Sequence, residues 1–154
     1  MQLLRRGYRG DEDYWRIRQF LRNIFRLNDR REVSWPVMRW DYWRWPGVES
    51  WGDGPLEGRV FIWEGPDGQM AAALNPESRG QAYLQVHPQW RSAELVSEML
   101  DTAERYLARA SADGRPTVSM WTDLQDSLQQ DLLRQDTGEP VALDWQAYCA
   151  GPIK

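Results

Sequence analysis

The chain has 154 residues and a mass of 18.1 kDa, which is the size of one compact domain. Hydrophobic residues make up 42% of it and charged residues 27%, so the composition excludes a disordered tail, a collagen-like rod and a repeat array. We expect a single domain over residues 1–150, with residues 151–154 (GPIK) as the start of a linker or tail.

Residues 1–20 contain no apolar h-region, and no run in the sequence approaches the roughly 20 apolar residues of a membrane helix. We therefore expect a cytoplasmic protein with no membrane partner. Cys149 is the single cysteine and His87 the single histidine, too few for an internal disulfide or a structural zinc site. The sequence predicts no bound metal.

Charge and tryptophan are both unevenly distributed. Residues 1–45 carry 11 arginines and 6 acids, a net +5, whereas residues 46–154 carry 8 basic residues and 17 acids, a net −9. Much of the arginine lies in one helix with an acidic first turn, which favours a solvated helix face, and we expect no nucleic-acid partner. Five of the 10 tryptophans lie between Trp35 and Trp51, and such a cluster indicates either a core or a pocket lining.

The first half of the chain predicts a strand followed by two helices. A short strand is expected at residues 3–8, and an amphipathic helix with acids in its first turn at residues 11–27. Ser34 is expected to cap a second helix that Pro46-Gly47 ends. The buried side of that helix is expected to include Val37, Trp40 and either Trp43 or Trp45.

The second half predicts three strands in a row and then alternating helices and strands. Strands at residues 60–64, 69–75 and 81–87 are separated by turn sequences, which indicates an antiparallel meander. Ser92 is expected to cap a helix that runs to about residue 109, with an apolar stripe that includes Tyr106. After the loop SADGR, a strand at 117–121 should pair parallel to the last meander strand or lie beside it.

A helix at 124–134 and a strand at 141–149 complete the expected order, βααβββαβαβ. This order predicts an α+β fold, an α/β/α sandwich with a mixed, mostly antiparallel sheet of about six to seven strands and four helices.

That order resembles the GNAT superfamily, the Gcn5-related N-acetyltransferases. The family typically has a strand ending in Val-x-Pro-x-x-Arg-Gly-x-Gly-Ile-Gly-x-x-Leu-Leu, and this chain reads VHPQWRSAELVSEML at the corresponding place. The positions in register are Val86, Pro88, Arg91, Leu95, Met99 and Leu100. The resemblance extends over nearly the whole chain, and the chain resembles one domain of a tandem GNAT protein.

The resemblance implies a cofactor, acetyl-CoA, whose pyrophosphate would lie on amides at the helix N-terminus. It also implies a thioester held by the backbone amides of Gln85 and His87. The implied cofactor-binding residues are Gln85, Val86, His87, Arg91, Ser92, Ala93, Glu94 and Leu95.

The three family glycines are replaced here by Ser92, Glu94 and Val96. A serine hydroxyl can itself hold a phosphate oxygen. Glu94, however, brings a carboxylate to the first helical turn, where it would repel a pyrophosphate, and Val96 adds bulk. These replacements favour a degenerate loop that no longer binds coenzyme A.

No catalytic residue is assigned by the sequence, and two residues are candidates for a general base. His87 ends the strand that would approach the reaction centre, and Glu64 ends an earlier strand. The alternative for His87 is a hydrogen-bonded turn residue. Gly138 corresponds to a family glycine after the last helix, but Glu139 and Pro140 follow it and no tyrosine lies close.

The tryptophan-rich segment occupies the place where GNAT-like folds bind the acceptor substrate. The implied acceptor-site residues are Trp35, Trp40, Asp41, Trp43 and Trp45. Asp41 is expected to pair with a cation held over aromatic faces, which would suit an amine or aromatic ligand. The alternatives are core packing and a partner interface.

Three functions remain open at this point. The first is a degenerate GNAT-like domain that binds a ligand or pairs, either with a second copy or with another GNAT-like domain. The second is an active N-acetyltransferase that moves acetyl from acetyl-CoA to a small amine or aromatic substrate. The third is an aromatic-lined small-molecule binder with no acyl chemistry.

Overall fold

The computed structural model describes residues 2–48 and 55–137, which belong to two compact units divided after Trp121. The first unit contains a sheet with helices, and the second contains one described helix. The single domain expected over residues 1–150 stays a prediction.

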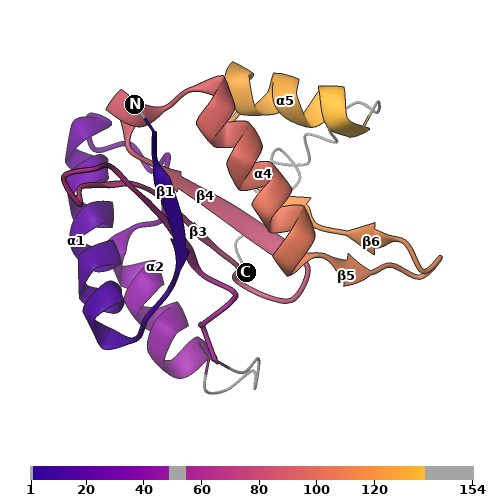
Figure 1. Ribbon diagram of the computed structural model, residues 1–154, viewed down its shortest axis with the longest axis horizontal. Helices are drawn as coiled ribbons and strands as arrows, with labels where there is room; N and C mark the ends of the chain where they lie inside the picture. The colour runs from indigo at the N-terminus through magenta and orange to yellow at the C-terminus, as the bar shows by residue number, and fades with distance from the viewer. Residues whose placement is uncertain (1, 49–54, 138–154) are drawn as a thin grey trace, which may run out of the picture. The chain divides into compact units, whose positions relative to one another are not determined.

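The sheet of the first unit has five strands in the order β1-β2-β3-β4-β7 (Figure 1). They are β1 (Leu4–Gly7), β2 (Phe61–Glu64), β3 (Met70–Asn75), β4 (Gln81–Val86) and β7 (Ser119–Met120). Neighbouring strands from β1 to β4 are antiparallel, and β7 is parallel to β4. The predicted meander and the parallel strand are confirmed, whereas the sheet has five described strands instead of six to seven. The expected strand at 141–149 lies outside the described residues.

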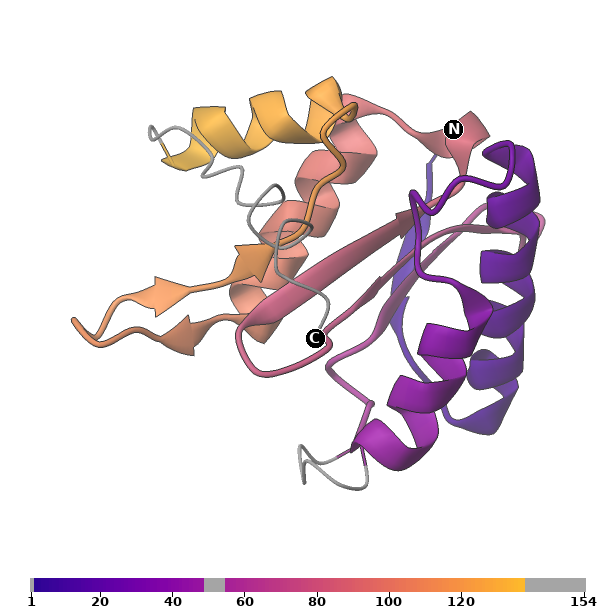
Figure 2. The same ribbon diagram turned by 180° about the vertical axis from the view of Figure 1, so that it is seen from behind.

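Helices cover both faces of this sheet. Figures 1 and 2 show α1 (Asp11–Leu27) and α2 (Val37–Tyr42) on one face and α4 (Ala93–Leu107) on the other. The strand side chains alternate between the faces, so Ile62 belongs to the core under α1 and α2, while Phe61 and Trp63 belong to the core under α4. The predicted α/β/α sandwich is therefore confirmed in the first unit.

The two long helices form where the apolar periodicity predicted them. Ile17, Leu21 and Ile24 of α1 are at most 1% exposed, and three acids occupy its first turn, where carboxylates complement the helix dipole. In α4 the helix ends at Leu107 instead of 109 because the next residues enter a strand. Tyr106 was expected on the buried stripe, but it is 43% exposed, so that assignment is wrong.

The second helix begins and ends differently from the prediction. Ser34 does not cap it; Pro36 is the N-cap residue, with extended backbone at φ −64° and ψ 147°. Pro46-Gly47 does not end the helical region either, because a π-helix, η1 (Trp43–Gly47), continues through Pro46. Proline lacks an N–H for the α-helical bond and its ring crowds the preceding turn, and a wider π turn accommodates it.

The expected strand at 117–121 is split into two short strands. Strand β6 (Pro116–Thr117) pairs antiparallel with β5 (Arg109–Ala110), and β7 joins the main sheet. The loop SADGR is the turn of this hairpin, closed by a 2.8 Å bond from the Ser111 N–H to the Arg115 carbonyl, with Gly114 at φ +81°. The β5–β6 hairpin was not predicted, because its strands are two residues each.

The described helix of the second unit is α5 (Ser127–Thr137), three residues later than the predicted 124–134. Asp126 precedes it, and its Oδ1 accepts from the Gln129 N–H at 3.1 Å, which is the N-capping bond. The residues before Asp126 form a turn that Gln130 holds through bonds to the carbonyls of Asp123 and Leu124. Within residues 2–48 and 55–137, no helix is long and apolar enough to cross a membrane.

Candidate functional site

The first element of the candidate site is the edge of β4. Strand β4 pairs with β3 from Tyr83 to Val86, but with β7 only at Gln81 and Ala82. Backbone groups alternate between the two neighbours of a strand. The His87 N–H donates to the Ala71 carbonyl, on the side of β3, at 2.9 Å. The backbone N–H and C=O of Val86 therefore point to the opposite edge of β4, beyond the residues that pair with β7.

This geometry corrects the implied thioester clamp. The amide of His87 is bonded to the β3 side, and Gln85, two residues earlier and paired with Ala73, faces the same way. Neither amide is directed to the open edge of β4. In this strand the amides of Leu84 and Val86 are the ones that alternation turns toward it.

The second element is the N-terminus of α4, where the family would hold the pyrophosphate. Ser92 is the N-cap residue as predicted, and its Oγ accepts from the Leu95 N–H at 3.2 Å. The Val96 N–H donates to the Ser92 carbonyl at 3.0 Å. The Glu94 carboxylate accepts from its own backbone N–H and from the Ser92 hydroxyl, and these bonds lower the pKa of Glu94.

The residues at this helix terminus do not fit a pyrophosphate. A pyrophosphate binds there through unpaired backbone N–H groups and a positive dipole end. Here the Ser92 Oγ already accepts from the Leu95 N–H, and the Glu94 carboxylate accepts from its own N–H. An ionised carboxylate stands in the same turn, and Val96 is fully buried, so its side chain packs into the core. Two amides of the first turn of α4 are thus already bonded within the chain.

His87 lies at the end of β4 and begins the turn η2 (Pro88–Trp90). Its Nδ1 accepts from the Gln89 N–H at 3.2 Å, and burial lowers the pKa of its ring. With Nδ1 used as an acceptor, the neutral ring carries its proton on Nε2 and has no free lone pair. His87 is therefore held in the turn, the alternative that the sequence left open, and its geometry does not suit a general base.

Glu64 is part of a buried ion network that the sequence did not predict. Arg6 donates two bonds of 2.9 Å to its carboxylate and bonds of 2.6 and 2.7 Å to Asp13, and Arg16 approaches Glu64 at 2.6 Å. Burial alone would raise the pKa of Glu64, but hydrogen bonds from both arginines hold it below its usual value. A carboxylate so strongly paired is a poor proton acceptor.

The tryptophans of the implied acceptor site separate into core and surface. Trp35, Trp40 and Trp43 are 4%, 0% and 2% exposed and belong to the core between the sheet and the first two helices. Trp45 is 40% exposed. The structure therefore does not bring the four rings together around one opening, and three of them follow the core-packing alternative.

Asp41 is also engaged within the chain. Its Oδ1 accepts from the Tyr14 hydroxyl at 2.6 Å and from the Arg18 Nε at 3.0 Å. The pair with Arg18 is about one-third exposed. Asp41 does pair with a cation, as expected, but that cation is an arginine of α1.

A cation held over aromatic faces does occur, at a place that the sequence did not indicate. The Arg39 guanidinium lies 4.6 Å from the Trp35 ring centroid and 4.8 Å from that of Tyr83. Glu77 binds it with bonds of 2.9 and 2.6 Å and accepts from the Tyr83 hydroxyl at 2.8 Å. We call these four residues the aromatic box. An amine-binding arrangement of this kind is filled here by the chain's own arginine.

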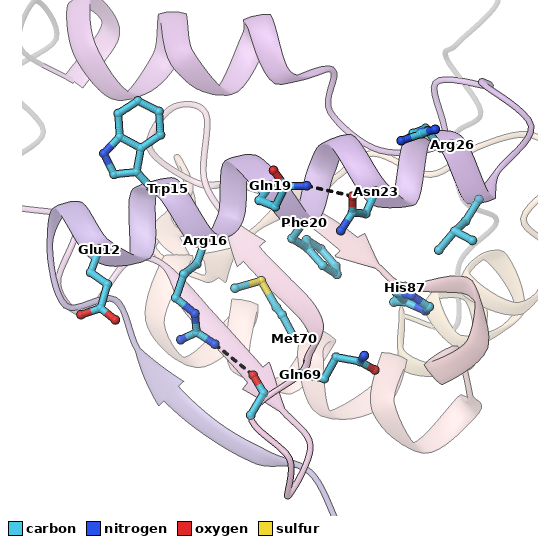
Figure 3. A pocket seen from close by; sticks show the side chains of 12 residues that line it. Glu12, Trp15, Arg16, Gln19, Phe20, Asn23, Arg26, Gln69, Met70 and His87 are labelled. Carbon is cyan, nitrogen blue, oxygen red and sulfur yellow. Dashed lines mark hydrogen bonds between the residues drawn. The ribbon is translucent and has the colours of Figure 1, made fainter.

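A groove of about 810 Å³ runs along α1 (Figure 3). One stripe of the helix, the start of β3 and His87 line it. Two hydrogen bonds join residues of its lining: the Gln19 Nε2 donates to the Asn23 Oδ1 at 3.0 Å, and Arg16 donates to the Gly68 carbonyl at 3.1 Å. Of the residues that the sequence proposed for a site, His87 is the one that lines this groove, and the groove offers shape but no reactive pair.

Comparisons with known proteins were made by family model, by sequence and by structure. No protein-family model matches the chain, and no curated protein matches it. A crystal structure of a GCN5-related N-acetyltransferase from Sphaerobacter thermophilus is similar, with a TM-score of 0.49 and 17% identity over 68% of this chain. The match covers 32% of that protein's chain, so this chain spans about a third of its length. Independently of that likeness, the order of strands and helices in the described residues agrees with the order expected from the sequence up to α5.

Proposed function

We propose that this chain is a GNAT-like domain that has lost the anchor for the coenzyme A pyrophosphate and serves as a pairing domain instead of an acetyltransferase. The observation that carries the proposal is the N-terminus of α4, where Ser92 and Glu94 use the amides that the cofactor would need. A helix end that already uses two of its amides and carries a carboxylate is a poor site for an anion, so acetyl-CoA is not expected to bind.

The candidate bases support the same conclusion. Acetyl transfer to an amine needs a group that accepts the amine proton. His87 uses its acceptor nitrogen in a turn, and Glu64 is bound by two arginines. The aromatic box likewise is filled by Arg39, so it has no place for a substrate amine.

Calorimetric titration of the full chain with acetyl-CoA tests this proposal. We expect no saturation at cofactor concentrations up to about 1 mM, which corresponds to binding weaker than about −4 kcal/mol. The variant Glu94→Gly should bind at least tenfold more tightly than the parent. The control Glu98→Gly makes the same change one turn later on α4, where the side chain is exposed, and should not improve binding.

Two results would overturn the proposal. A parent chain that binds acetyl-CoA at micromolar concentration would retain the anchor and would restore the acetyltransferase interpretation. Equal binding by the parent and Glu94→Gly would show that the carboxylate at the first turn is not what excludes the cofactor.

A further inference from the structure

The outer face of α1 and α2 carries a group of exposed large hydrophobic side chains. Met38, Tyr42 and Trp45 recur at helical spacing along α2 and η1 and are 79%, 63% and 40% exposed, and Trp15 of α1 is 60% exposed. We call these four residues the α1–α2 patch. Figures 1 and 2 both show the two helices side by side.

Ring contacts join the two helices within this patch. The Tyr14 ring lies 4.9 Å from Trp15 and 5.3 Å from Trp45, edge-on in both cases. The Tyr14 hydroxyl donates to Asp41, the residue before Tyr42. Tyr14 therefore links Trp15 of α1 to Trp45 of η1.

The area of the patch is large for a surface that stays in water. With about 150–250 Å² for a large side chain, the exposed fractions leave about 500 Å² of side-chain surface. That is within the range of the largest patch on a typical monomer, and such patches mark interaction sites. A standard interface takes about 800 Å² from each partner, so the patch would supply more than half of one side of a dimer and the polar residues around it would supply the rest.

Two ion pairs lie beside the rings of the patch. Arg18 pairs with Asp41 at 3.0 Å and lies 5.7 Å from the Trp15 ring centroid, while Arg44 pairs with Asp11 at 3.4 Å. A partner of strong net charge gains nothing from two arginines and two aspartates. An identical surface gains ion pairs, because a two-fold axis can place each arginine against the partner's aspartate.

We propose that the α1–α2 patch is the surface through which two copies of this chain pair. The inference rests on the proposed function, in that it names the partner of the pairing domain. Aromatic residues, methionine and arginine are enriched at the centres of protein interfaces, and the patch consists of two tryptophans, a tyrosine and a methionine with arginines beside them.

Sedimentation equilibrium of the full chain at about 5–200 µM tests the proposal. We expect a dimer with a dissociation constant in the micromolar range, and at least a tenfold weaker dimer for Met38→Glu and Tyr42→Glu. Both side chains are exposed, so both variants should keep the circular dichroism spectrum and the thermal unfolding of the parent. Leu4→Glu, at a 66% exposed position on β1, is the control and should leave the dimer intact.

A parent that is monomeric at 200 µM, or a dimer that persists in both patch variants, would overturn the inference. So would a dimer that Leu4→Glu dissociates while the patch variants do not. The titration with acetyl-CoA is a separate readout. A monomer that does not bind acetyl-CoA would reject the α1–α2 patch as a pairing surface but would still support the loss of the pyrophosphate anchor. A dimer that binds acetyl-CoA at micromolar concentration would support the pairing surface but reject the loss of the anchor.

Discussion

Replacing Arg6 with methionine removes the cation that two buried carboxylates share. The side chains of Arg6, Asp13 and Glu64 are 11%, 4% and 13% exposed, so the variant leaves two acids with little access to water. Breaking a buried ion pair costs about 3–5 kcal/mol. Arg16 approaches both acids at 3.5 and 2.6 Å and offsets part of this, and we therefore expect a loss of about 3 kcal/mol.

The loss should depend on pH with a definite sign. Hydrogen bonds from Arg6 hold the pKa of Asp13 and of Glu64 below their usual values against the opposing effect of burial. A group with a lowered folded-state pKa stabilises the fold above its unfolded pKa, and this stability is lost as the pH falls through the folded value. The difference between the parent and Arg6→Met should thus be full at pH 7 and shrink below about pH 4.

Urea unfolding followed by circular dichroism at pH 7 and at pH 3.5 measures both effects. Arg9→Met is the matched control, because Arg9 is exposed and should change the free energy of unfolding by less than about 0.5 kcal/mol. A free energy of unfolding for Arg6→Met within about 1 kcal/mol of the parent value, or a deficit of the same size at both pH values, would contradict this role of Arg6.

Three further predictions concern buried polar groups. His87, the single histidine, should titrate by NMR with a pKa below its usual value, because burial favours the neutral ring. Its contribution to the stability of the fold is then lost as the pH falls below about 6.5. A measured pKa above that value would contradict the turn geometry. Gln85→Leu should lower the free energy of unfolding in urea by about 2–4 kcal/mol, since the Trp35 N–H and the Asn75 side chain lose their hydrogen bonds of 2.8 and 3.1 Å to Gln85. A loss under about 1 kcal/mol would show that those groups find other partners. Tyr83→Phe, which removes the hydroxyl bonded inside the aromatic box, should cost about 1–2 kcal/mol, and an unchanged midpoint would mean that the box is held by stacking alone.

The parts of the fold that the sequence predicted are those that local patterns decide. The long helices and the meander follow from apolar spacing and turn residues, and the Ser92 cap follows from side-chain chemistry. The predicted N-cap of α2 was wrong, because Pro36, with its extended backbone, holds the N-cap position that was predicted for Ser34. The π turn was not predicted because Pro46-Gly47 is a common helix end, whereas here the wider turn accommodates the proline within the helical region.

The candidate site could be predicted in part. The sequence found the acid in the first turn of α4, and the structure adds that Glu94 bonds the amide of its own residue. The aromatic box could not be found, because Arg39 meets residues 38 and 44 positions away. Helical spacing placed Trp40 on the buried side correctly, but it did not decide between Trp43, which is buried, and Trp45, which is exposed.

The most direct measurement observes the backbone amides at the start of α4 while coenzyme A is added. In a ¹⁵N-correlated NMR titration, the amide signals of Ala93, Glu94 and Leu95 should stay in place with acetyl-CoA or inorganic pyrophosphate at about 1 mM. Saturable shifts of those signals at micromolar ligand would place an anion on this helix terminus and contradict the account.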